Sequence, residues 1–119
     1  MSTIPQMARR VLRRGRTAKR HGYDLESLHR LRCVVRRLRF ALEWLEADTA
    51  QLVKVQDALG EACDFGVALH DLGSRRGKRV KHYRASMGRD LRRARQEARA
   101  VFLAVHPHVE ELASGARDG

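Results

Sequence analysis

The residues most able to do chemistry form a row of cations in the segment 28–43. At about 100° of rotation per helical residue, these side chains fall on one stripe beside a leucine seam. They are His29, Arg32, Arg36 and Arg39, and Glu43 continues the stripe. Guanidinium groups are planar, permanently charged and donate paired hydrogen bonds that match phosphate oxygens. The row therefore predicts a binding site for a phosphate-type anion.

A simpler interpretation is that the row is only a solvated helix face. The (i, i+4) pair of Arg39 with Glu43 would then contribute a few tenths of a kcal/mol. Arg32 and Arg36 have the same spacing but like charges, so their repulsion would cost a similar amount. We favour a binding site, because a locally unfavourable row indicates a partner that relieves the repulsion.

Charge is distributed unevenly along the chain, whose net charge is +11 over 119 residues. Residues 1–39 hold 12 basic and 2 acidic residues, and residues 74–99 hold 11 and 2, whereas residues 40–73 hold 1 and 7. Such segregation indicates basic surfaces built by particular helices. Beside the row, we expect a secondary basic surface made of arginines in the first and last helices. These are Arg9, Arg13, Arg16, Arg84, Arg92, Arg95 and Arg99. Whether they face the same side as the row is left open by the sequence.

Apolar residues at three- and four-residue spacing predict four helices and no strand. The helices are expected over residues 5–20, about 24–47, about 50–72 with an interruption at Gly60, and from the loop 73–77 to a point before Pro107. Their short connections favour an all-α fold, an antiparallel four-helix bundle. We expect one domain over residues 1–119, with a core over about 5–105 and a polar tail over 106–119.

The second helix is also apolar on the side away from its leucine seam, where Cys33, Phe40 and Trp44 project. These side chains either cover the edges of their own bundle or form an interface with a second bundle, where large aromatic residues are favoured. Cys33 and Cys63 are both expected to be buried thiols, since free cysteine is among the most buried residue types.

Two ordered motifs in this chain resemble the CHAD domain, the conserved histidine α-helical domain. The first is the basic helix 29–43, which begins as His-x-x-Arg, and the second is the Gln-Asp-x-Leu-Gly segment 56–60 with Asp64 four residues past the glycine. The resemblance covers about residues 5–105, and its distinctive residues lie within 28–64.

The resemblance implies an all-helical fold in which basic helices line a cavity for inorganic polyphosphate. Matching of the motifs assigns anion binding to the row and one neighbour, and assigns Asp64 to organising the turn. The implied anion-binding residues are His29, Arg32, Arg36, Arg37 and Arg39. Family domains contain two such bundles and this chain has one. The one bundle resembles the C-terminal copy of the family domain. The resemblance therefore implies a homodimer, or pairing with a second CHAD-like bundle, that rebuilds the cavity; the alternative is a fragment whose site is incomplete.

The alternative function is that of a non-specific nucleic-acid-binding basic helical protein, since a protein of this charge holds DNA or RNA at low salt. No helix-turn-helix pattern or aromatic stacking platform points to specific recognition. The chain is not expected to be an enzyme, because His29 lacks the paired carboxylate, nucleophile or phosphate loop that catalysis would use. No cofactor is expected, and no metal site is expected at His106 and His108.

The longest apolar run, residues 100–105, is far shorter than the roughly 20 residues that cross a bilayer. The basic N-terminal segment also lacks the apolar centre of a signal peptide. We therefore expect no membrane partner and a cytoplasmic location. The resemblance adds an expected association with polyphosphate granules.

Overall fold

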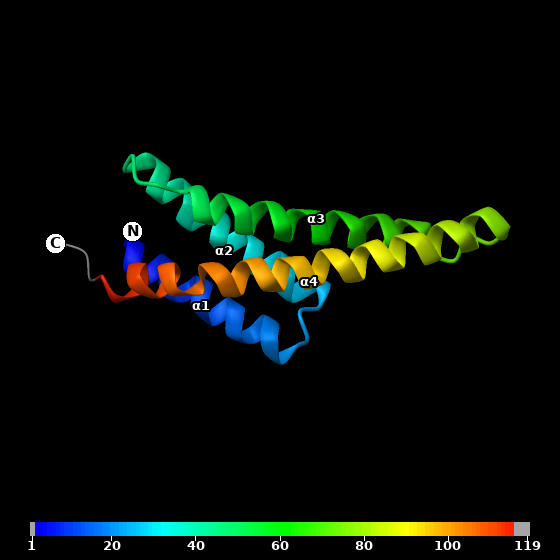
Figure 1. Ribbon diagram of the computed structural model, residues 1–119, viewed down its shortest axis with the longest axis horizontal. Coiled ribbons are helices and arrows are strands. Elements are labelled where there is room, and N and C mark those ends of the chain that lie inside the picture. The colour runs from blue at the N-terminus through cyan, green and yellow to red at the C-terminus, as the bar shows by residue number, and fades with distance from the viewer. Residues whose placement is uncertain (1, 116–119) are drawn as a thin grey trace.

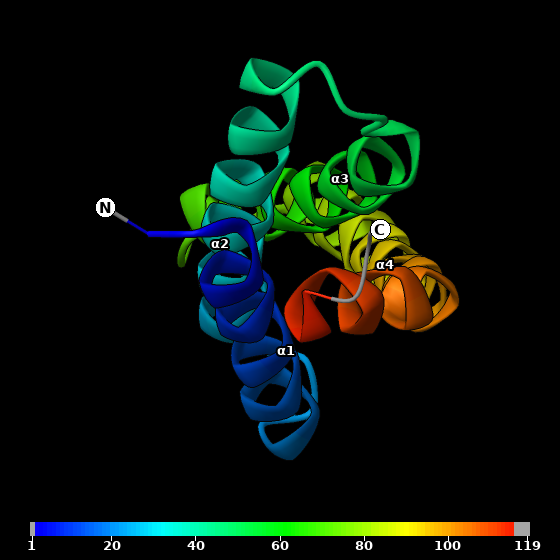
Figure 2. The ribbon, with the colours of Figure 1, turned by 90° about the vertical axis from the view of Figure 1, so that its left-hand side faces the viewer.

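The computed structural model describes residues 2–115, and this part of the chain forms four α-helices and no strand. They are α1 (Ile4–Arg20), α2 (Leu25–Trp44), α3 (Ala50–Leu72) and α4 (Lys78–Ser114). Consecutive helices run in opposite directions, and each contacts two others in the closed ring α1–α2–α3–α4 (Figure 1). The α1–α2 pair crosses the α3–α4 pair obliquely (Figure 2). The predicted all-α four-helix bundle is confirmed.

Side-chain caps fix the starts of the first two helices. Thr3 and Gln6 form a capping box, in which the Gln6 backbone N–H donates to Thr3 Oγ1 over 3.2 Å and the Thr3 N–H donates to Gln6 Oε1 over 2.9 Å. Asp24 caps α2 by accepting a hydrogen bond of 2.9 Å from the Ser27 N–H. The Ser27 hydrogen bonds lower the pKa of Asp24, because they stabilise its charged form.

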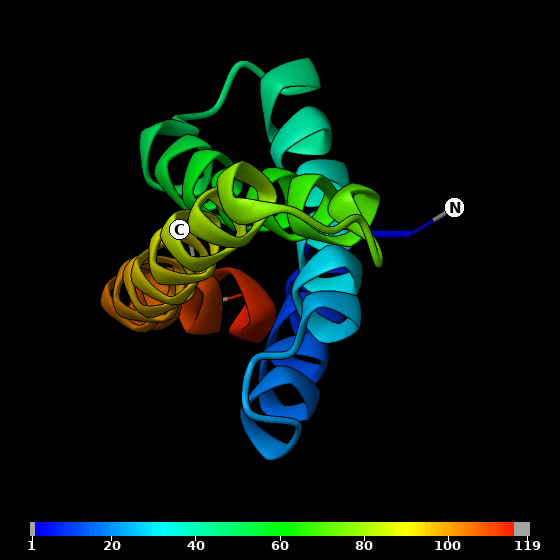
Figure 3. The same cartoon turned by 90° about the vertical axis from the view of Figure 1, so that its right-hand side faces the viewer.

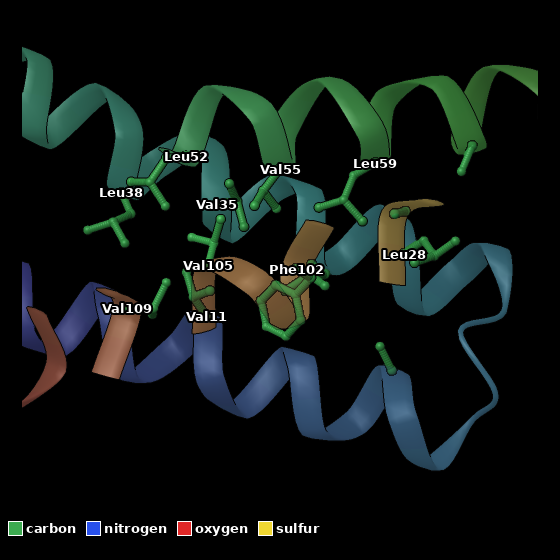
Figure 4. Close-up of a cluster of buried hydrophobic side chains, with 14 of the residues drawn as sticks. Val11, Leu28, Val35, Leu38, Leu52, Val55, Leu59, Phe102, Val105 and Val109 are labelled. Carbon is green, nitrogen blue, oxygen red and sulfur yellow. The ribbon is translucent and has the colours of Figure 1, made fainter. Parts of the chain in front are cut away.

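The core lies where the apolar seams of the four helices meet (Figure 4). The seam predicted for the second helix is confirmed as its buried face except at its last residue, Leu45, which follows the end of α2 and is 63% exposed. The buried face consists of Leu28, Leu31, Val35, Leu38 and Leu42. Fully buried side chains of α1 and α3 pack against it, and α4 closes the core with Phe102, Val105 and Val109.

Gly15 on α1 lets α4 approach closely. The Phe102 ring lies over the glycine, and a Cβ added there would sit 2.5 Å from Phe102 Cζ and 2.6 Å from Cε2. Both residues are buried. Glycine is therefore the residue type that admits the ring at this crossing of α1 and α4.

Two expected helix breaks are wrong. α3 passes through Gly60 without interruption, and α4 continues through Pro107 to Ser114. The residues after Pro107 keep the helical spacing, and Val109 and Ala113 are buried in the core. Burial of these side chains outweighs the one backbone hydrogen bond that a helical proline removes.

The observed ends of the helices also differ from those expected, and this changes the limits of the core and of the tail. The core extends to Ala113 instead of ending near residue 105, so the segment 106–115 is helix and not a polar tail. The remaining tail residues, 116–119, lie outside the described part of the chain. α2 ends at Trp44 instead of continuing to about Ala47, and Glu46 follows with a positive φ of 57°.

α3 and α4 continue past the α1–α2 turn as a two-helix arm, here defined as residues 67–90 (Figures 1 and 3). None of these residues is buried. Tyr83, which continues the apolar three- and four-residue spacing of α4, is 52% exposed, and Val80 and Met87 are half-buried. In the arm only α3 and α4 face each other, so α4 has too few neighbours to bury its apolar stripe.

Candidate anion-binding site

The row on α2 lies along the groove between α2 and α3. Arg39 donates from Nη1 to Gln56 Oε1 of α3 over 3.1 Å. The Arg32 guanidinium lies over Gly60, where an added Cβ would be 3.6 Å from Arg32 Nε. His29 lines a hollow of about 280 Å³ together with Cys63 and other residues of α3. Three of the predicted residues thus meet the same helix.

Arg36 completes the row at its exposed edge. Its guanidinium carbon lies 5.2 Å from the centre of the Phe40 ring, and that of Arg39 lies 5.4 Å from the same ring. Such cation–π contacts stabilise the orientation of both arginines. The structure therefore brings together four of the five predicted residues: His29, Arg32, Arg36 and Arg39.

Arg37 does not join them. It follows Arg36 by one residue, which rotates it about 100° around the helix toward the outer side of α2. Its side chain is exposed there. The matching of motifs grouped Arg37 with the row, but the helical geometry separates it.

The charge of the row is largely unneutralised. Within residues 2–115 its one ion pair joins Arg39 Nε to Glu43 Oε1 over 2.8 Å. The contacts that Arg32 and Arg39 make with α3 are to the uncharged Gln56, Gly60 and Cys63, and the acidic group of α3 that acts on the Cys63 thiol together with Arg32 is Asp64. Burial raises the pKa of the Cys63 thiol, which favours its neutral form despite the nearby Arg32. The groove therefore presents excess positive charge.

Two arginines of the secondary basic surface bind backbone carbonyls, Arg9 at the C-terminal end of α4 and Arg95 in the turn between α1 and α2. Arg9 donates from Nη1 to the Ala113 carbonyl over 2.9 Å. Arg95 donates from Nε to the Tyr23 carbonyl over 2.9 Å and from Nη2 to the Gly22 carbonyl over 2.8 Å. Ala113 is in the last turn of α4, where carbonyls lack partners within the helix and attract cations. Arg9 and Arg95 thus have structural roles.

Arg84 has the same kind of role at the arm. Its Nη2 donates to the Gly73 carbonyl over 3.0 Å and to the Arg75 carbonyl over 2.9 Å, which fixes the loop after α3. Arg99 lies over the Tyr23 ring at 5.6 Å. Three further arginines of the set are exposed: Arg13, Arg16 and Arg92.

The secondary basic surface does not extend the row. α2 and α4 occupy opposite corners of the helix ring. The row borders α3, whereas Arg92, Arg95 and Arg99 surround a hollow of about 200 Å³ beside the α1–α2 turn. The two basic regions therefore lie on different grooves of the bundle.

The two cysteines differ in their surroundings. Cys63 is buried as expected, whereas Cys33 is exposed, and its Sγ lies 3.8 Å from His29 Nε2. The expectation that Cys33 is buried is wrong, because none of the other described helices covers the outer side of α2. Phe40 and Trp44 are also exposed there, at 45% and 88%.

Asp64 occupies an exposed position on the continuous helix α3, so the turn that it was expected to organise does not exist.

In the described part of the chain, no three His, Cys, Asp or Glu residues lie close enough to hold a metal ion. His106 instead pairs with Glu110, with 3.1 Å between Nδ1 and Oε1. Among the described helices, none is long and apolar enough to cross a membrane.

Sequence reasoning missed the residues that support the site. Gln56 and Gly60 were identified only as parts of a motif, and nothing local showed that they face Arg39 and Arg32. The available signal was their shared spacing of four residues, which places both on one face of α3.

Comparison with known proteins adds no relative: no family model, no curated protein and no solved structure matches this chain.

Proposed function

We propose that this chain binds inorganic polyphosphate, or a similar linear polyanion, through the row of His29, Arg32, Arg36 and Arg39. The observation that carries the proposal is the alignment of these four cationic or titratable side chains along one groove, where within the described residues a single ion pair, that of Arg39 with Glu43, neutralises any of them. A polyanion would relieve their mutual repulsion. Arg37 lies on the outer side of α2, so it adds to the overall positive electrostatic potential and does not line the groove.

The geometry favours a flexible chain of phosphates. Ten residues separate His29 from Arg39, which corresponds to about 15 Å along a rigid helix. A chain-like anion can contact several cations over this length. Gln56 and Glu43 hold Arg39, and Phe40 flanks two of the arginines. Side chains that are already oriented lose less conformational entropy when a ligand binds.

The two motifs that resemble the CHAD domain also support this proposal together. Gln56 and Gly60 from the second motif touch Arg39 and Arg32 from the first. The motifs are thus parts of one surface. We propose that the chain is a CHAD-like bundle and that it acts by binding, without catalysis or a cofactor, in the cytoplasm or at polyphosphate granules.

A second bundle is part of the proposal. Phe40, Trp44 and Leu45 are 45%, 88% and 63% exposed at the C-terminal half of α2, next to Arg36 and Arg39. Exposed apolar residues grouped in this way are typical of interaction sites. A second copy related by a twofold axis would cover them and place a second row near the first.

The test is a titration with long-chain polyphosphate at about 0.15 M salt, where exposed charges are screened beyond roughly 8 Å. Arg32→Glu and Arg36→Glu should each weaken binding about tenfold or more, since each removes a phosphate contact and adds repulsion. Arg10→Glu is the matched control, because Arg10 is exposed on α1, away from the groove. Equal losses in all three variants would refute a localised site.

Two further measurements complete the test. Light scattering during the titration should give the mass of a dimer, and Trp44→Glu should convert it to a monomer. Duplex DNA should compete poorly for the row at this salt concentration. A monomer from which DNA displaces polyphosphate completely would contradict the proposed groove and the proposed pairing.

A further inference from the structure

α4 carries a second set of cations that is separate from the row. Five of them fall within an arc of about 80° on one flank of the helix. They are Lys78, Lys81, Arg89, Arg92 and Arg99, and we call them the α4 line. All five side chains are exposed. From Lys78 to Arg99 the line extends about 31 Å at 1.5 Å per residue.

The outer half of the line lies on the arm, which projects beyond the α1–α2 turn (Figure 1). Residues 73–84, around the tip, include six basic residues and no acidic one. Arg84 binds the carbonyls of Gly73 and Arg75, so the loop is held against α4. This contact keeps the exposed Arg75 and Arg76 beside the start of the line. The arm therefore presents a fixed group of cations away from the bundle.

The surface around the middle of the line is shallow and open. Ala85 and Gly88 lie between its cations and leave a hollow of about 480 Å³, which Leu69, Arg89 and Arg92 also line. Small side chains at this point allow an extended backbone to approach α4 closely. The two acidic residues of α4 between Lys78 and Arg99, Asp90 and Glu97, line a different hollow, about 120–140° around the helix from the line.

We propose that the α4 line and the tip of the arm bind the sugar-phosphate backbone of double-stranded nucleic acid. An exposed line of about 31 Å on one helix matches roughly one helical turn of a duplex, about 34 Å. The duplex is stiff over far longer distances and offers only one side to such a line. The contacts go to phosphates, so binding does not depend on base sequence.

A membrane surface fits the line less well. Helices that lie on membranes insert a broad apolar face beside their cations. Beside the line Ala85 and Gly88 are small, and the large apolar side chains are isolated: Leu69 lines the hollow from α3, and Leu103 is exposed one turn past Arg99. The exposed Tyr83 projects from a different side of α4. The line therefore suits a phosphate backbone better than a membrane surface.

The experiment uses the full chain and a duplex of about 20 base pairs, roughly two helical turns. Lys78→Glu with Lys81→Glu changes two cations one turn apart in the arm. Loss of two phosphate contacts should reduce the slope of the logarithm of the association constant against the logarithm of the salt concentration by about 1.8. If binding at 1 M salt is unchanged, this corresponds to about 60-fold weaker binding at 0.1 M salt. Arg10→Glu with Lys19→Glu is the control of equal charge change, on exposed positions of α1.

Polyphosphate binding is measured on the same variants and on Arg32→Glu with Arg36→Glu. The arm variant should keep polyphosphate affinity within about threefold, and the variant of the row should keep the duplex salt slope. Losses of duplex binding that are equal in the arm, α1 and row variants would overturn the α4 line, as would an unchanged slope in the arm variant. Failure of the proposed row would appear separately, as polyphosphate binding that ignores Arg32 and Arg36. Circular dichroism should show unchanged helix content in all variants.

Discussion

Replacement of Gly15 by alanine tests the packing of α1 against α4. The added Cβ would lie 2.5 Å from Phe102 Cζ and 2.6 Å from Cε2. Unstrained carbon contacts are about 3.5–4.0 Å, so the ring must move by about 1 Å. Phe102 is only 3% exposed and is surrounded by other core residues, which leaves it little room (Figure 4).

Two opposing effects set the magnitude. Overpacking of a core costs about 1–3 kcal/mol, and a shift of this size belongs to the upper part of that range. Alanine gains about 1 kcal/mol over glycine inside a helix. We expect Gly15→Ala to lower the free energy of unfolding by about 1–2 kcal/mol. For a chain of this length the melting temperature should fall by roughly 4–8 °C.

Urea unfolding followed by circular dichroism at 222 nm measures this change, with Gly88→Ala as the control. The nearest atom to a Cβ at Gly88 is Arg92 Nη1 at 3.8 Å, so that substitution should stabilise the chain by up to about 1 kcal/mol. In a Phe102→Leu background the shorter side chain removes the clash, and Gly15→Ala should become neutral or stabilising. A stabilising Gly15→Ala in the natural sequence would refute the close contact.

The remaining predictions concern an arginine and the two cysteines. Arg95→Met should lower the free energy of unfolding by about 1–3 kcal/mol, because it removes two hydrogen bonds from a charged group to the α1–α2 turn, whereas Arg92→Met should change it by less than about 0.5 kcal/mol. Equal effects in urea unfolding would contradict the structural role of Arg95. A thiol-alkylating reagent near pH 8 should modify Cys33 first, since Cys63 is buried and its raised pKa keeps it protonated until the pH is higher. Mass spectrometry of Cys33→Ser and Cys63→Ser would show the order, and comparable rates for the two thiols would be inconsistent with the fold.

The existence of the helices and their buried faces within the bundle were predictable, because both follow from local spacing, whereas the apolar stripe of α4 in the arm is not buried. The stripe of leucines on α2 is buried as expected, and the same periodicity places the cations of the row side by side. Gly60 and Pro107 were misleading, because each weakens a helix locally although tertiary packing can keep that helix intact. In α4, burial of Val109 and neighbouring side chains preserves the helix through Pro107.

The sequence by itself determined that this protein is helical, that its charge is segregated and that one helix carries a row of cations. Only the tertiary structure decided which helix borders that row, which arginines bind carbonyl oxygens and how far the α3–α4 arm projects. The physical reason is the range of the interactions. Hydrophobic periodicity depends on neighbouring turns of one helix, whereas a long arginine side chain takes whichever partner another helix brings within reach. In this chain Arg95 thus joins residues more than 70 positions apart, a contact that no local pattern encodes.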